Sequence, residues 1–291
     1  MTSVIPIPPS FDAEGDLEIS STLTYIKFLE TQKVSTVMTT AGTSLFNLLT
    51  ENEIRRFNET IYSTLIPKKI IGVPPLSLNK AKEFVDKQSE NFCFYADKNY
   101  SYMFLYPDRF YEEDVLLDYF RELKDYIKSG IYIHTMPMRN GKGGEWNYTS
   151  SVLNKLYSED VLIGIKEEYF NLASAYDFVN SLLPGIDVIV AGGSMRRFEY
   201  LKNAGANSFL AGIGNVFPSI ENDYLLGDTK SIVLENKFFN TMMKHGWHRT
   251  LRIALSIKHQ TCLHDRKPWP IRYEKIVKDV HNILEEIENE K

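Results

Sequence analysis

Short apolar runs recur along the chain at a regular spacing, and this recurrence constrains the fold more than any other feature. Strand, helix, strand repeated in this way implies parallel pairing with right-handed crossovers. Eight such units within 291 residues predict a (β/α)8 TIM barrel of the α/β class. The runs typical of strands lie at 4–7, 34–40, 69–73, 102–106, 131–136, 161–166, 186–191 and 208–211. Helical spacing of apolar residues lies between them at 17–30, 116–127, 173–183 and 198–204.

A doubly wound open sheet is the competing architecture. It often carries a glycine-rich turn after the first strand, but here Pro8-Pro9-Ser10-Phe11-Asp12 follows, with no GxGxxG motif. We therefore favour the barrel. After the eighth strand, 238–255 and 276–290 have further helical patterns, and no linker rich in Pro, Gly or Ser marks a second independent domain. We expect a barrel over 1–225 and a C-terminal helical region packed on it over 226–291.

Composition and charge exclude several classes of partner. A formal net charge of -5 and a pI near 5.8 leave no electrostatic footprint for nucleic acid or for an anionic membrane surface. No apolar run approaches the ~18 residues of a transmembrane helix. The two cysteines, Cys93 and Cys262, lie far apart without a CxxC motif, so a reducing cytoplasm is expected. The C-terminal histidines lack an evident carboxylate partner, and no metal site is expected.

Lys166 closes the apolar run of the sixth strand, at the end where barrels carry their chemistry. A strand this apolar is typically buried on both faces. A buried lysine tends to lose its proton, and the neutral amine condenses with ketones and aldehydes to form a Schiff base. The alternative is that Lys166 merely ends the strand, with its stem packed down and its ammonium in solvent.

Several short motifs, taken in order, resemble one family over nearly the whole chain. The chain resembles the dihydrodipicolinate synthase and N-acetylneuraminate lyase superfamily, pyruvate-handling class I aldolases on a (β/α)8 barrel. The motifs are Phe11-Asp12 with Glu14-Gly15-Asp16, Gly164-Ile165-Lys166-Glu167, Ala191-Gly192, Ala204-Gly205-Ala206 and Arg266-Lys267-Pro268.

The resemblance implies a chemistry and an assembly. It implies that Lys166 attacks the ketone of pyruvate or of a related 2-oxo acid. The resulting iminium acts as an electron sink, so that an adjacent C–C bond can form or break. It implies a small-molecule substrate, no cofactor beyond the lysine itself, and a homotetramer or homodimer.

The resemblance also assigns substrate-binding residues. The family's Thr-Thr turn aligns on Gly42-Thr43, so Thr43 and Ser44 would supply hydroxyl and backbone N–H donors to the substrate carboxylate. Gly192 and Leu210 fall where the family lines its pyruvate pocket. Arg139 would hold a second carboxylate, for which a guanidinium is suited. From the residues alone, these positions equally fit ordinary turns, core packing and a solvated arginine.

The proton relay is where the chain departs from the family pattern. The family's relay tyrosine is replaced by His134, and the threonine partner of that tyrosine by Gly42. An imidazole titrates near neutral pH and can shuttle protons, but His134 equally fits a hydrogen-bonded histidine with no catalytic part. Tyr132 points the same way from the same strand, and a register slip would bring it nearer the site.

Three functions follow from these residues. The first is a Schiff-base-forming lyase of the aldolase type. The second is a 2-oxo acid dehydratase of the same family. The third is a diverged barrel that binds a 2-oxo acid without aldol turnover, because both relay residues are substituted.

Overall fold

A computed structural model describes residues 1–39, 42–92, 99–107, 112–136, 148–193, 195–264, 266 and 274–291. Arg139 lies outside the described residues. The chain divides into two compact units, each of which is described by itself. The first comprises Met1–Thr2 and Lys68–Leu210, and the second comprises Ser3–Pro67 and Ala211–Lys291. The short strand β1 (Thr2–Ser3) contains the boundary between them.

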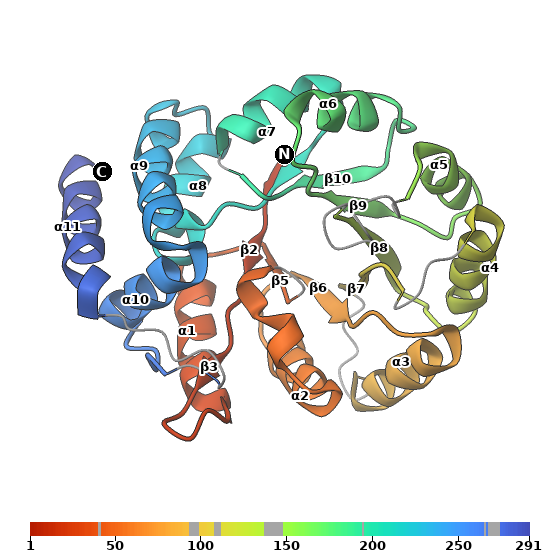
Figure 1. Cartoon of the computed structure of the whole chain (residues 1–291), viewed down its shortest axis with the longest axis horizontal. Helices are drawn as coiled ribbons and strands as arrows, with labels where there is room; N and C mark the ends of the chain where they lie inside the picture. Colours follow the sequence, from red (N-terminus) through yellow and green to blue (C-terminus); the bar gives the residue numbers. More distant parts are fainter. Residues whose placement is uncertain are drawn as a thin grey trace. The chain divides into compact units, whose positions relative to one another are not determined.

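The first unit alternates strands and helices without interruption. Its strands pair in chain order, each parallel to the next, and helices α3 to α7 lie along their outer side (Figure 1). The elements are β6 (Lys68–Val73), α3 (Leu78–Phe92), β7 (Tyr100–Phe104), α4 (Glu113–Lys124), β8 (Gly130–Thr135), α5 (Ser150–Ser158), β9 (Gly164–Glu167), α6 (Leu172–Asn180), β10 (Asp187–Val190), α7 (Met195–Leu201) and β11 (Ser208–Phe209).

The second unit combines the first part of the chain with its C-terminal helices. Strands β2 and β5 pair in parallel, and helices α9, α10 and α11 pack on one another (Figure 1). The elements are β2 (Ile5–Pro6), β3 (Ser10–Phe11), β4 (Leu17–Glu18), α1 (Ile19–Thr31), β5 (Thr36–Met38), α2 (Glu51–Tyr62), α8 (Pro218–Leu225), α9 (Lys230–His245), α10 (Trp247–His259) and α11 (Glu274–Glu290), with short 3-10 turns at Gly42–Ser44, Phe46–Leu48, Lys202–Ala204 (in the first unit) and Ile213–Asn215.

This alternation is the predicted TIM-barrel fold with added C-terminal helices. Each of the eight expected strands has a counterpart among the described residues, namely β2 and β5 to β11. The boundary expected between 225 and 226 stays a prediction. In the described part of the chain, none of the helices has the length and apolar character needed to cross a membrane.

Two expected helices differ from the structure in instructive ways. The helix expected over 17–30 begins only at Ile19, because Leu17 pairs with Phe11 in the antiparallel hairpin β3–β4. Glu18 then caps the helix by accepting from the backbone N–H groups of Ser20 and Ser21. The helix expected over 238–255 is two helices, because Gly246 takes a φ of 93° that ends α9.

The base of the first unit is packed around a tyrosine ring. Tyr132 of β8 lies level with Gly164 of β9. Its hydroxyl donates to Asp187 and receives a hydrogen bond from Lys68 Nζ at 2.7 Å. A Cβ added at Gly164 would lie 2.4 Å from the Tyr132 ring and 2.5 Å from the Asp187 carbonyl oxygen. The glycine therefore admits the ring.

Gly164→Ala is expected to lower the free energy of unfolding by about 1–3 kcal/mol, because a packed ring and a backbone carbonyl must both move. Gly130→Ala is the matched control. Its added Cβ meets the Ile163 side chain, with Cδ1 at 2.0 Å, and the end of that side chain can turn away. Urea denaturation of both variants measures the difference. Equal destabilisation would contradict this account of Gly164.

Candidate active site

Lys166 and His134 stand side by side at the carboxyl ends of two neighbouring strands. The register of β8 and β9 places His134 opposite Lys166. Both side chains are buried, with relative exposures of 2% for His134 and 1% for Lys166. The structure thus brings together the two residues predicted to be catalytic. The prediction that the Lys166 stem is packed while its ammonium reaches solvent does not describe this arrangement.

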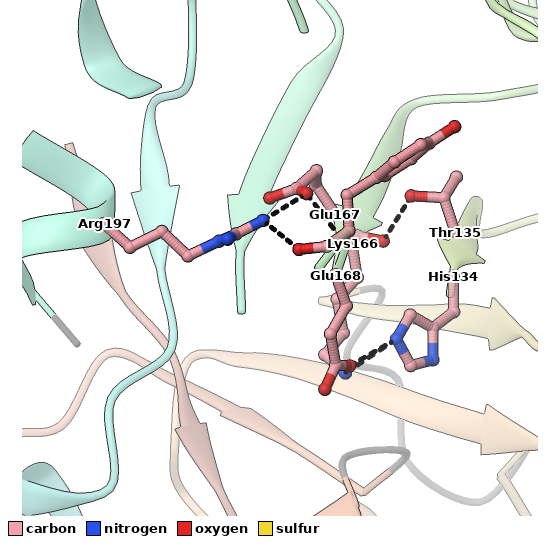
Figure 2. Close-up of polar contacts among 7 residues, drawn as sticks. His134, Thr135, Lys166, Glu167, Glu168 and Arg197 are labelled. Carbon is pink, nitrogen blue, oxygen red and sulfur yellow. Dashed lines mark hydrogen bonds and ion pairs between the residues drawn. The ribbon is translucent and has the colours of Figure 1, made fainter. Parts of the chain in front are cut away.

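A third residue, Glu168, completes a compact polar cluster with these two. Lys166 Nζ lies 2.9 Å from His134 Nε2 and 2.7 Å from Glu168 Oε2. The His134 Nε2 atom lies 2.8 Å from the same Glu168 oxygen. Figure 2 shows the Lys166 and Glu168 side chains reaching toward His134. Three atoms therefore lie within hydrogen-bond distance of one another, in a site almost closed to solvent.

Glu168 is the anionic member of this cluster. Burial opposes the ionisation of its carboxyl, but the attraction of Lys166 and the hydrogen bond from His134 outweigh burial and hold the pKa well below its usual range. Glu168 is thus a carboxylate at neutral pH, and it sits beside the amine that is the candidate nucleophile.

Arg197 holds the backbone on either side of Glu168, from the face of β9 opposite to Lys166. Successive residues of a strand face opposite ways, so Glu167 points away from Lys166 and Glu168. Its buried carboxylate accepts from Arg197 Nη2 at 2.6 Å and from the Tyr169 N–H at 2.7 Å. Arg197 Nη2 also donates to the Tyr169 carbonyl at 2.7 Å. The Arg197 contacts fix the turn that follows β9.

Gly192, a predicted pocket residue, lies directly against Glu168. Its φ is +68°, and an added Cβ would meet Glu168 Cγ at 2.7 Å. The left-handed conformation favours glycine, and the missing side chain makes room for the glutamate. Leu210, the other predicted pocket residue of this unit, is buried just after β11. Its N–H donates to the Val190 carbonyl at 2.9 Å.

Tyr132 does not reach the cluster. It precedes His134 by two residues, and its hydroxyl is engaged with Lys68 and Asp187 at the amino end of the strands. Burial and the negative charge of Asp187 raise its pKa well above the usual range. The register slip that would bring Tyr132 to the site is not found in the structure.

The residues predicted to bind the substrate carboxylate belong to the second unit. Gly42, Thr43 and Ser44 form a 3-10 turn. Thr43 Oγ1 accepts from the Trp247 indole N–H at 2.9 Å, and Ser44 Oγ donates to the Ile7 carbonyl at 2.9 Å. Because a hydroxyl has one proton, Ser44 in this state would offer a ligand its backbone N–H. The role of this turn stays a prediction, as does that of Arg139.

Solved structures of dihydrodipicolinate synthases and related proteins have the same fold as this chain. The chain matches YagE, a prophage protein of the dihydrodipicolinic acid synthase family from E. coli K12 in complex with pyruvate. The TM-score is 0.80 at 15% identity, over 99% of this chain and 98% of that one. It also matches a dihydrodipicolinate synthase from Thermotoga maritima, with a TM-score of 0.78 at 18% identity over 99% and 98%. The chain has the dihydrodipicolinate synthase fold.

One curated sequence relative accompanies these matches. It is a 2-dehydro-3-deoxy-phosphogluconate/2-dehydro-3-deoxy-6-phosphogalactonate aldolase from Sulfurisphaera tokodaii, 24% identical over 197 residues. The match covers 67% of this chain and 63% of the relative, so the chain spans less than two thirds of that protein's length. No family model matches the chain. The resemblance to the dihydrodipicolinate synthase superfamily is thus confirmed at the level of the fold, and the curated sequence relative is an aldolase.

Glu168 is the site residue that sequence reasoning missed. A signal was present, since Glu168 follows Lys166 by two residues, and a strand that continues past Lys166 turns both side chains the same way. The sixth strand was expected to end at Lys166, but β9 continues to Glu167. Because the strand extends by this one residue, the Glu168 side chain lies on the same side as Lys166, with Oε2 2.7 Å from Lys166 Nζ.

Proposed function

We propose that the chain is a Schiff-base-forming lyase of the aldolase type, in which Lys166 condenses with pyruvate or a related 2-oxo acid. The observation that carries this proposal is the Lys166 amine, buried at the carboxyl end of β9 and 2.9 Å from an imidazole nitrogen. A lysine in contact with a base has a route to the neutral, nucleophilic form. A carbon–carbon bond beside the resulting iminium could then form or break.

The relatives support the same chemistry. One of the solved structures is described in complex with pyruvate, and the curated relative is named as an aldolase. Both are consistent with a class I aldolase whose substrate is a small 2-oxo acid. No cofactor is needed in this proposal, because the lysine itself supplies the electron sink once the iminium has formed.

The remaining assignments rest on the sequence resemblance. Thr43 and Ser44 would bind the substrate carboxylate, with Gly192 and Leu210 lining the pocket and Arg139 holding a second polar group. A homotetramer or homodimer in the cytoplasm is part of the same proposal. A dehydratase that shares the Schiff base is the runner-up, and product analysis separates it from an aldolase.

The test is a covalent trap with the full chain. The protein is mixed with pyruvate, reduced with borohydride, and its mass measured before and after proteolytic mapping. We expect one reduced pyruvate unit, attached to Lys166, and no label when borohydride is added without pyruvate. An unlabelled protein, or a label on another lysine, would overturn the proposal.

A further inference from the structure

We propose that Glu168 is a catalytic residue of this site. Its carboxylate pairs with the positive charge while a proton passes from the Lys166 amine through His134 to the hydroxyl that leaves as water. This inference rests on the proposed function, because it names the group that manages the proton of the Schiff-base reaction. Its basis is the triangle of Lys166 Nζ, His134 Nε2 and Glu168 Oε2, with sides of 2.9, 2.8 and 2.7 Å.

The three contacts cannot all be hydrogen bonds at once. A histidine nitrogen either carries a proton or offers a lone pair. When His134 Nε2 is protonated it donates to Glu168 and cannot accept from Lys166. When it is unprotonated it accepts from Lys166 and has nothing to donate to Glu168. The cluster therefore has two arrangements that differ in which nitrogen holds the proton, and Glu168 receives a hydrogen bond from Lys166 in both.

The carboxylate stabilises the cation in both arrangements. Its Oε2 lies 2.7 Å from Lys166 Nζ and 2.8 Å from His134 Nε2, so the cation is paired whether the proton is on the lysine or on the histidine. Burying a cation without a partner is strongly unfavourable. Removing the Glu168 carboxylate would take this charge partner away from both cations and would favour loss of the proton.

The backbone is shaped to admit this side chain. Gly192 has a positive φ, and a Cβ there would lie 2.7 Å from Glu168 Cγ. On the other side of the strand, Arg197 binds Glu167 and the Tyr169 carbonyl, so the turn carrying Glu168 is held at both flanking residues. The glutamate is therefore placed by its surroundings and not by the lysine alone.

The proposed steps balance in atoms and charge. A proton moves from the Lys166 ammonium to His134 Nε2, and the freed lone pair attacks the keto carbon. An N–C bond forms while the carbonyl π electrons move to oxygen. His134 delivers its proton to this oxygen and takes one from the new ammonium, which gives a neutral carbinolamine. The imidazolium then protonates the hydroxyl, water leaves, and the nitrogen lone pair closes the iminium. Its positive charge is paired with Glu168.

The experiment times adduct formation at saturating pyruvate by quenching with borohydride. Glu168→Gln keeps the shape of the side chain and removes its charge, and we expect iminium formation to slow by about 100-fold, the range of general acid–base catalysis. The label should still reach Lys166 at long times. Glu199→Gln is the matched control, because it removes a surface carboxylate that pairs with Lys202 at 2.8 Å, and it should leave the rate unchanged.

Two further variants separate catalysis from a structural role. Glu168→Asp keeps the charge on a shorter side chain and should react at an intermediate rate. Glu168→Ala should regain rate with added formate, a free carboxylate, and not with chloride. A Glu168→Gln protein that is folded by circular dichroism and labels at the wild-type rate overturns this proposal alone. A wild-type protein that never labels overturns the proposed function, and this inference with it.

Discussion

Lys166→Arg is expected to abolish the borohydride-trapped adduct and to lower turnover of any 2-oxo acid aldol that the wild type cleaves by about a thousand-fold or more. A guanidinium keeps the positive charge beside Glu168, so the buried ion pair at 2.7 Å retains a cation. It stays protonated at all accessible pH values and is therefore no nucleophile. The variant should fold and bind the substrate while losing the chemistry.

Lys69→Arg is the matched control for this substitution. Lys69 is also a buried lysine on a strand, with 3% exposure, but it lies near the amino end of β6. Its variant should label at Lys166 as the wild type does. Intact mass spectrometry after reduction, together with a coupled assay for released pyruvate, measures both variants. Labelling of Lys166→Arg at the wild-type level would show that another group carries the reaction.

Arg197→Met is expected to lower the free energy of unfolding by about 3–5 kcal/mol at neutral pH. Glu167 is fully buried, and Arg197 is its cationic partner, with Nη2 2.6 Å from the carboxylate. Removing one member of a buried pair leaves the other charge without compensation. The turn that carries Glu168 also loses a hydrogen bond to the Tyr169 carbonyl, so adduct formation should slow as well.

The loss of stability in Arg197→Met should depend on pH. Burial already raises the pKa of Glu167 in the wild type, against the attraction of Arg197. A carboxyl with a raised pKa in the folded state contributes stability below its unfolded pKa and loses it as the pH rises. Without Arg197 the pKa rises further. The deficit should therefore be smallest in acid and grow toward neutral pH.

Urea denaturation across this pH range measures the effect, and a double variant provides the control. Glu167→Gln with Arg197→Met removes both charges together, so most of the lost stability should return. A double variant that is as unstable as Arg197→Met alone would indicate that packing of the arginine stem, and not the buried carboxylate, accounts for the loss.

The fold was largely predictable because its signal is local. Each strand of the barrel is a short apolar run, and the periodicity of the intervening helices is carried by neighbouring residues. The errors arose where a hairpin pairing or the backbone angle of one residue overrides the pattern of apolar residues. Leu17 fits a helical pattern, yet its pairing with Phe11 places it in a hairpin. The stretch 238–255 has the apolar pattern of one helix, but the φ of 93° at Gly246 divides it into two.

The candidate site was predictable only in part. Lys166 could be singled out because it ends an apolar strand, and His134 because it stands where the family resemblance leads one to expect a tyrosine. That the two nitrogens lie 2.9 Å apart depends on the register of β8 and β9, which is set by pairing across many residues. Glu168 depends also on Gly192 and Arg197, which come from other segments.

The sequence by itself therefore determined the barrel, the candidate nucleophile and the strand end on which it lies, because these follow from hydrophobic periodicity within short windows. Only the tertiary structure decided what surrounds the nucleophile. The distance between an amine, an imidazole and a carboxylate is set by strand register and by a turn held from a distant helix. No local pattern encodes that distance. The position of the proton among the three groups in turn depends on it.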